Sequence, residues 1–219
     1  MAEMPEAILW DMDGTLVDTE PYWMNAEREL VASFGGVWTD ELAHQLVGNP
    51  LVVSAQMIRE NSPVALPDEE IVDTLLKSVI RQMQEHIPWR PGAAELLKAA
   101  VTQGIPNALV TMSYESFARV MVDELPTGTF GAVVTGDVVE HGKPHPQPYL
   151  VAAEALGVDP SHCLAVEDSP TGARSAVAAG ARTIAVPHIV DVPDEVGAVK
   201  VATLAGETIE SLWSRTTQS

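Results

Sequence analysis

Residues 9–18 read Leu9-Trp10-Asp11-Met12-Asp13-Gly14-Thr15-Leu16-Val17-Asp18. The apolar run over residues 7–10 is typical of a buried strand in a parallel sheet, and ligands bind just beyond the carboxyl ends of such strands. Asp11 and Asp13 would lie at that edge, where two neighbouring carboxylates are costly to bury without a cation. A hard divalent ion such as Mg²⁺ would satisfy them with oxygen ligands. The alternative interpretation is a strand that ends in an Asx-rich turn.

Three later segments favour the metal-binding interpretation. They are Thr111-Met112-Ser113, Gly142-Lys143-Pro144 and Val166-Glu167-Asp168-Ser169. Together with residues 11–15 they match, in order, the four motifs of the haloacid dehalogenase (HAD) superfamily. The chain resembles the phosphatase and β-phosphoglucomutase-like branch of that superfamily, and the resemblance covers essentially the whole chain.

The resemblance implies an α/β fold, with a doubly wound, parallel-sheet, Rossmann-like core and an all-helical cap inserted after the first motif. We expect the core to comprise residues 1–16 and 88–219, and the cap residues 17–87. The sequence pattern agrees, because no good strand interrupts the helical spacing of the cap, whereas helices and strands alternate from residue 90 onward. The expected strands are 7–10, 108–110, 132–134, 163–166 and 183–186. The expected helices are 21–34, 39–47, 51–58, 67–87, 91–101, 115–122, 149–156 and 170–179.

Composition and charge limit the possible partners. The 219 residues carry a net charge of −19, which would repel nucleic acid and anionic membranes, so we expect neither as a partner. A small phosphorylated metabolite is the expected partner of a monomer. The single cysteine, Cys163, cannot form an internal disulfide and is interpreted as a buried strand residue. No signal peptide or membrane-length apolar run is found, which predicts a cytoplasmic protein. The polar tail after Arg215 is expected to be disordered.

The resemblance implies three catalytic residues. Asp11 matches the nucleophile that forms an aspartyl-phosphate, and Asp13 matches the general acid/base. The dehalogenases of the superfamily lack an acid at the position of Asp13, so this residue argues for phosphoryl transfer. Lys143 matches the lysine that neutralises the nucleophile and the phosphate. The alternative for a lone lysine is a solvated surface position.

The resemblance also implies a metal site and a phosphate site. Mg²⁺ would be held by the carboxylates of Asp11 and Asp168 and by the backbone carbonyl of Asp13, with Glu167 as a neighbour that does not bind the metal directly. Thr111 would bind a phosphate oxygen together with backbone N–H groups near Met112 and Ser113. The alternatives are ordinary turn chemistry for Thr111 and an N-cap for Asp168 or Ser169. One departure from the family is Gln147, where an acid usually follows the lysine-proline pair; we interpret that position as a helix cap.

The predicted activity is Mg²⁺-dependent hydrolysis of a small phosphomonoester through an aspartyl-phosphate, with a sugar phosphate as the candidate substrate. One alternative is a hexose phosphomutase of the same branch, and another is a non-catalytic phosphate-binding protein. Against the mutase, Trp23 occupies the position of the cap histidine of those enzymes, and residues 48–51 contain no Arg or Lys. Arg28 and Arg59 are the nearest cap cations. Against the non-catalytic protein, the full set of motif residues is present.

Overall fold

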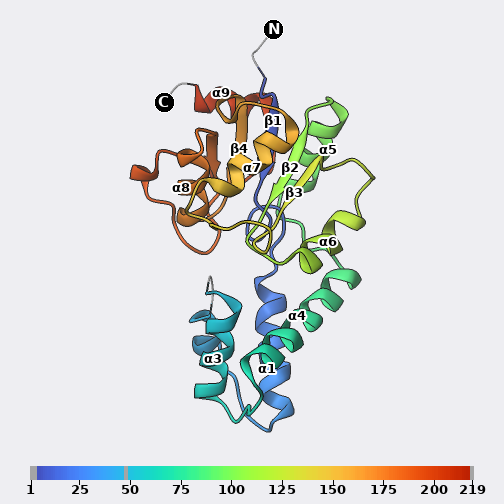
Figure 1. The fold of residues 1–219 in the computed structure, drawn as a ribbon, viewed down its shortest axis with the longest axis vertical. Coiled ribbons are helices and arrows are strands. Elements are labelled where there is room, and N and C mark those ends of the chain that lie inside the picture. Colours follow the sequence, from blue (N-terminus) through green and yellow to red (C-terminus); the bar gives the residue numbers. More distant parts are fainter. Residues whose placement is uncertain (1–3, 47–48, 218–219) are drawn as a thin grey trace. The chain divides into compact units, whose positions relative to one another are not determined.

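The computed structural model describes residues 4–46 and 49–217. The chain forms two compact units, which we call the core unit (residues 1–18 and 88–219) and the cap unit (residues 19–87). Figure 1 shows the course of the chain through both units.

In the described part of the core unit, six parallel strands form one sheet in the order β3-β2-β1-β4-β5-β6. The central strand β1 pairs with β2 on one side and β4 on the other, so that Leu9 lies opposite both Ala108 and Ala165. The predicted parallel sheet is therefore confirmed. The strands are β1 (Ala7–Trp10), β2 (Asn107–Val110), β3 (Ala132–Val134), β4 (Cys163–Glu167), β5 (Arg182–Ala185) and β6 (Val199–Lys200).

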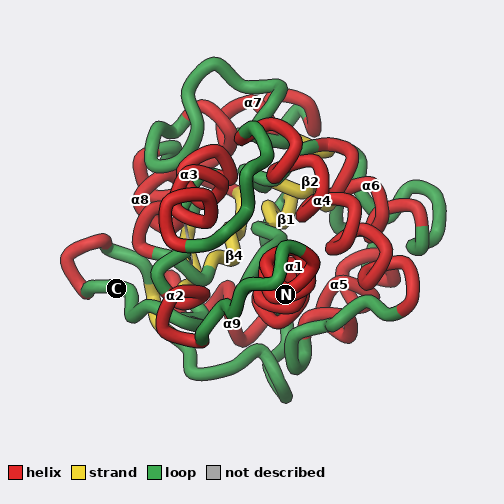
Figure 2. Tube along the Cα trace, turned by 90° about the horizontal axis from the view of Figure 1, so that it is seen from below, coloured by secondary structure: helices red, strands yellow, loops and turns green. Residues whose placement is uncertain are grey.

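Helices cover both faces of this sheet. Helices α7 and α8 pack on the face that carries Leu9, Ala108 and Ala165, and α5 and α9 contact each other on the opposite side (Figure 2). This arrangement confirms the doubly wound core. The core helices are α5 (Ala93–Thr102), α6 (Glu115–Asp123), α7 (Gln147–Leu156), α8 (Pro170–Ala178) and α9 (Ile209–Thr216), with two short 3₁₀ turns, η1 (Pro160–His162) and η2 (Asp194–Val196).

Two core elements were absent from the sequence prediction. Strand β6 is only two residues long, which is too short to produce a periodic signal. Helix α9 begins at a capping box between Thr208 and Ser211 and buries Ile209, Leu212 and Trp213. Thr216, the first residue after Arg215, belongs to this helix, so the expectation of a disordered tail was wrong for it; residues 218–219 lie outside the described part of the chain.

The cap unit consists of helices packed on one another. Helix α4 contacts both α1 and α3, and none of the described cap residues lies in a strand, as predicted. The helices are α1 (Glu20–Ser33), α2 (Asp40–His44), α3 (Leu51–Asn61) and α4 (Asp68–Glu85). Thr39 caps α2, but α2 ends at His44 rather than at Val47; Val47 and Gly48 are not among the described residues. None of the helices that the structure describes is long and apolar enough to cross a membrane.

The two segments that connect the core to the cap run antiparallel to each other. Val17 pairs with Trp89, Asp18 donates its N–H to the Pro88 carbonyl at 2.9 Å, and Arg90 donates to the Leu16 carbonyl at 2.8 Å. His188 lies between these segments, with its Nε2 3.1 Å from Asp18 Oδ1 and its Nδ1 against the Arg90 guanidinium. The core unit therefore holds residues 16–18, which lead into the cap, against residues 88–90, which lead out of it.

Candidate active site

The carboxyl ends of three neighbouring strands bring the candidate residues together. Asp11 directly follows β1, Thr111 follows β2, and Glu167 ends β4. The Asp11 N–H bonds the Val166 carbonyl at 3.0 Å, which extends the pairing of β1 with β4 by one residue. Strand β2 lies on one side of β1 and β4 lies on the other, so the strand order reverses direction at β1. Ligand sites in open α/β sheets form at such a topological switch point.

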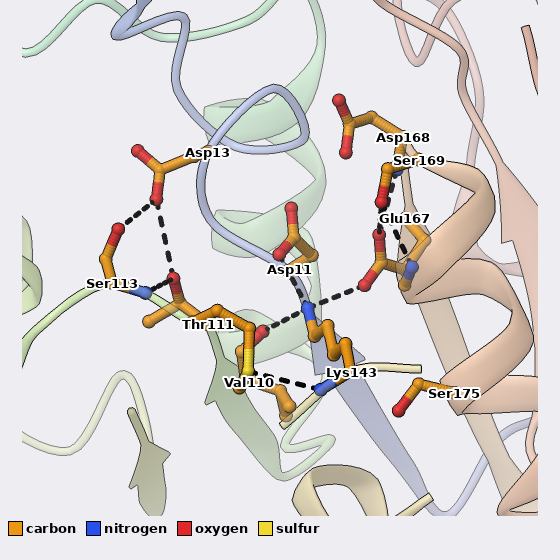
Figure 3. Close-up of polar contacts among 12 residues, drawn as sticks. Asp11, Asp13, Val110, Thr111, Ser113, Lys143, Glu167, Asp168, Ser169 and Ser175 are labelled. Atoms are coloured by element: carbon orange, nitrogen blue, oxygen red, sulfur yellow. Dashed lines mark hydrogen bonds and ion pairs between the residues drawn. The ribbon is translucent and has the colours of Figure 1, made fainter. Parts of the chain in front are cut away.

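Lys143 lies at the centre of this group (Figure 3). Its Nζ is 2.7 Å from Asp11 Oδ1, 2.6 Å from Glu167 Oε1 and 2.8 Å from the Val110 carbonyl oxygen. The side chain is only 6% exposed. Burial alone would lower the pKa of Lys143, but the carboxylates of Asp11 and Glu167 raise it above its ordinary value. Lys143 is therefore a buried cation beside Asp11 and not a surface lysine.

The second oxygen of Asp11 has a different environment. Asp11 Oδ2 is buried and has no hydrogen-bond partner in the described part of the chain. Carboxylate oxygens of Asp11, Glu167 and Asp168 lie within 4.8 Å of one another. Burial and the charges of Asp11 and Glu167 raise the pKa of Asp168 to about 9. An orphaned carboxylate oxygen beside a second crowded carboxylate is compatible with a divalent cation, which would satisfy both.

Two glycines allow the chain to approach these acids closely. Gly14 has a φ of +86°, and a Cβ at that position would lie 2.1 Å from Asp168 Oδ2. A Cβ at Gly172, in the first turn of α8, would lie 2.0 Å from Glu167 Oε1. Any larger residue would displace the carboxylates, so both glycines are needed for this geometry.

Glu167 is fully buried, and both of its oxygens have partners. Oε1 accepts hydrogen bonds from Lys143 and from the Tyr149 hydroxyl, at 2.6 and 2.7 Å. Oε2 accepts from the Asp168 N–H at 3.2 Å and the Ser169 hydroxyl at 3.4 Å. Ser169, and not Asp168, caps α8 by accepting the N–H of Gly172.

Asp13 is held by two hydroxyl groups from the segment after β2. Its Oδ2 accepts hydrogen bonds from Ser113 Oγ at 2.7 Å and from Thr111 Oγ1 at 3.4 Å. Thr111 Oγ1 in turn accepts the Ser113 N–H at 3.0 Å. Two of the residues assigned to phosphate from the sequence, Thr111 and Ser113, thus contact the proposed acid/base directly, as Figure 3 shows.

Two contacts could not be foreseen from the sequence. The Met112 sulfur accepts the backbone N–H of Lys143 at 3.3 Å, which joins the second motif to the third. Tyr149 would be assigned to the core from its helical position alone, and no sequence signal shows that its hydroxyl faces Glu167.

Gln147, the departure from the family pattern, accepts the backbone N–H of His141 through Oε1 at 2.7 Å and so stabilises the loop before α7.

Comparison with known proteins places these observations in a family. A model of haloacid dehalogenase-like hydrolases matches residues 5–180. A phosphorylated carbohydrates phosphatase of Thermotoga maritima is 33% identical over 187 residues, covering 82% of this chain and 83% of the relative. Hexitol phosphatase B of Escherichia coli K12 is 34% identical over 187 residues, with 83% of each chain covered.

A solved structure has the same fold. CbbY from Rhodobacter sphaeroides, determined with phosphate and, as a mutant, with xylulose-1,5-bisphosphate, superposes with a TM-score of 0.81 at 29% identity, covering 95% of this chain and 99% of CbbY. The chain belongs to the haloacid dehalogenase-like hydrolases. Relatives named as phosphatases match this chain over most of their length, and the chain is a phosphoric monoester hydrolase.

Proposed function

We propose that this enzyme is a Mg²⁺-dependent phosphatase that hydrolyses a small sugar phosphate through an aspartyl-phosphate on Asp11. The observation that carries the proposal is the unequal environment of the two Asp11 oxygens. Lys143 holds Oδ1 at 2.7 Å, whereas Oδ2 is buried beside Asp168 with no hydrogen-bond partner among the described residues. Relatives that act on phosphorylated carbohydrates and hexitol phosphates support the substrate class.

The residues that would hold Mg²⁺ are the carboxylates of Asp11 and Asp168 and the backbone carbonyl of Asp13. When bound, the ion would neutralise charge on the phosphate and on the nucleophile. Glu167 would support the site without binding the ion, because Lys143, Tyr149, Ser169 and the Asp168 N–H already occupy its oxygens. Its role is then to orient Lys143.

In the first step, an Asp11 oxygen attacks phosphorus in line and the bond between phosphorus and the sugar oxygen breaks. Protonated Asp13 gives its proton to the departing oxygen, so that the sugar leaves as an alcohol. In the second step, ionised Asp13 removes a proton from water, and the water oxygen attacks phosphorus. The bond from phosphorus to Asp11 breaks, inorganic phosphate leaves, and Asp13 is protonated again.

Lys143 would balance the negative charge on the phosphoryl oxygens in both steps, because its ammonium group already lies against Asp11. Thr111 would bind a phosphoryl oxygen through its hydroxyl, with help from backbone N–H groups at Met112 and Ser113. Since both hydroxyls contact Asp13, substrate binding would exchange part of this bonding for contacts with phosphate.

A phosphomutase must hold a second phosphate, and the cap unit offers little to bind one. Each Lys or Arg of the described cap is already paired with a cap carboxylate: Arg28 with Asp40, Arg59 with Asp68, Lys77 with Asp73 and Arg81 with Glu29. These pairs support transfer of the phosphoryl group to water rather than to a sugar.

The direct test is phosphate release from a panel of hexose, pentose and hexitol monophosphates, with one bisphosphate included, in Mg²⁺ and in EDTA. We expect turnover of at least one monophosphate that EDTA abolishes and Mg²⁺ restores. The mutase is tested with a β-hexose 1-phosphate and a trace of the bisphosphate. Accumulation of hexose 6-phosphate with little free phosphate would replace the hydrolase by the mutase.

A further inference from the structure

Tyr149 is a fully buried residue of α7 that none of the four motifs contains. Its hydroxyl donates a hydrogen bond to Glu167 Oε1 at 2.7 Å. Burial and the charge of Glu167 raise the pKa of Tyr149 well above its ordinary value, so the group remains a protonated donor. A buried hydroxyl costs free energy unless it is hydrogen-bonded, and a phenylalanine would fill the same space without this cost.

The Glu167 oxygen that Tyr149 contacts is the one that contacts Lys143. Lys143 Nζ lies 2.6 Å from Glu167 Oε1 and 5.2 Å from the centre of the Tyr149 ring. Tyr149 therefore contacts Lys143 directly through the face of its ring, and indirectly because both residues bind the Glu167 carboxylate. An ammonium group has three hydrogen-bond donors, and Asp11, the Val110 carbonyl and Glu167 account for all three.

The other hydrogen bonds of Glu167 go to Oε2, so only Tyr149 and Lys143 fix the position of Oε1. The Asp168 N–H and the Ser169 hydroxyl bind Oε2 at the longer distances of 3.2 and 3.4 Å. Without the Tyr149 hydroxyl, Oε1 would keep only the lysine, and the carboxylate could rotate and take the ammonium group with it.

We propose that Tyr149 is a positioning residue, whose hydroxyl fixes the Glu167 carboxylate and through it holds Lys143 at Asp11. This inference rests on the phosphatase function proposed above. The positive charge of the lysine beside Asp11 would stabilise the transferring phosphoryl group most strongly in the transition state, where charge develops on its oxygens. A misplaced ammonium group therefore weakens binding of a transition-state mimic, which a purely structural role of Tyr149 would not do.

The test compares Tyr149→Phe with Thr183→Val, which also removes a buried hydroxyl and nearly keeps the shape of the side chain. Thr183 lies in β5, and its hydroxyl donates to the Ala181 carbonyl at 3.0 Å. The probe is orthovanadate, whose inhibition constant does not depend on the fraction of folded enzyme. Loss of one hydrogen bond corresponds to a change of up to about tenfold. For Tyr149→Phe we expect kcat to fall and the vanadate inhibition constant to rise by about that factor, whereas Thr183→Val leaves both within twofold.

A second comparison tests whether Tyr149 acts through Glu167. The double variant Tyr149→Phe with Glu167→Gln should lose no more activity than Glu167→Gln alone, because the hydroxyl then has no carboxylate to position. An unchanged vanadate constant in active Tyr149→Phe, or losses that multiply in the double variant, would overturn the inference. Absence of turnover in the wild-type protein would instead refute the proposed function, so the two failures are distinct.

Discussion

Ser113 Oγ lies 2.7 Å from Asp13 Oδ2, which is the shorter of the two hydroxyl contacts that hold this carboxylate. The contact joins the segment after β2 to the turn after β1, across two neighbouring strands. It orients the group that must exchange a proton with the leaving oxygen and then with water. Substitution of Ser113 should therefore affect proton transfer without removing the acid itself.

Ser113→Ala should lower kcat/KM by roughly three- to tenfold, the effect of one lost hydrogen bond, because Thr111 still contacts Asp13. Steady-state kinetics against the best substrate of the panel would measure this. Ser214→Ala, which removes a hydroxyl from the last turns of α9, is the control and should have no effect. A loss as large as that of Asp13→Asn would show that Ser113 does more than orient Asp13.

Asp13→Ala should spare Mg²⁺ affinity more than Asp168→Ala does. Asp13 is expected to offer the ion only its backbone carbonyl, which alanine retains, whereas Asp168 offers its carboxylate. Titration calorimetry of both variants in the same buffer compares the two directly. Equal losses of affinity would contradict the division of roles between the two acids.

Gly14→Ala should weaken Mg²⁺ binding because the added methyl group would meet Asp168 Oδ2. Alanine at a positive φ also costs on the order of 1–2 kcal/mol of backbone strain. Gly128→Ala is the matched control, since Gly128 has a φ of +87° but no atom within 4 Å of the added Cβ. We expect both variants to lose stability in urea unfolding, but only Gly14→Ala to lose Mg²⁺ affinity in calorimetry. Wild-type affinity in Gly14→Ala would show that the close approach to Asp168 is unimportant.

Burial raises the pKa of Glu27 in the cap unit to about 7, although the Trp38 indole donates a hydrogen bond to it. In the folded state the carboxyl group therefore holds its proton to a higher pH than in the unfolded state. Its contribution to stability falls as the pH rises from about 4.5 to about 7, and the full penalty applies above that range.

Glu27→Gln should remove this penalty while keeping an acceptor for Trp38. At pH 8 we expect the variant to be more stable than the wild type by roughly 2–3 kcal/mol, and at pH 4.5 nearly equal to it. Urea unfolding followed by circular dichroism measures both values. Glu29→Gln, which removes an exposed ion pair with Arg81, should change stability by less than about 1 kcal/mol at either pH. A variant less stable than the wild type at pH 8 would contradict the assignment.

Much of the core could be predicted because its signals are local. Each buried strand is a short apolar run, and the acids of the first and fourth motifs directly follow such runs in β1 and β4. Parallel strands place such acids at one edge of the sheet, and the resemblance to the haloacid dehalogenase superfamily groups Asp11 with Asp168.

The remaining features depend on tertiary packing. The Tyr149 hydroxyl reaches Glu167, and the Met112 sulfur reaches the Lys143 N–H, only after α7 and the loop before it fold onto the sheet. Tyrosine and methionine on an apolar face have the same pattern as any core residue, so the sequence could not distinguish these polar contacts. His188 likewise joins Asp18 and Arg90, which lie in distant parts of the chain.

The central claim, that Asp11 is the nucleophile, is tested most directly by trapping the phosphoenzyme. Wild-type enzyme and Asp11→Asn are mixed with substrate and Mg²⁺, quenched in acid within the first turnover and digested for mass spectrometry. The account predicts one phosphoryl group on Asp11 of the wild type, none in Asp11→Asn, and a turnover of that variant that is lower by about 10³-fold or more. A phosphoryl group on another residue, or Asp11→Asn activity within a few-fold of wild type, would contradict it.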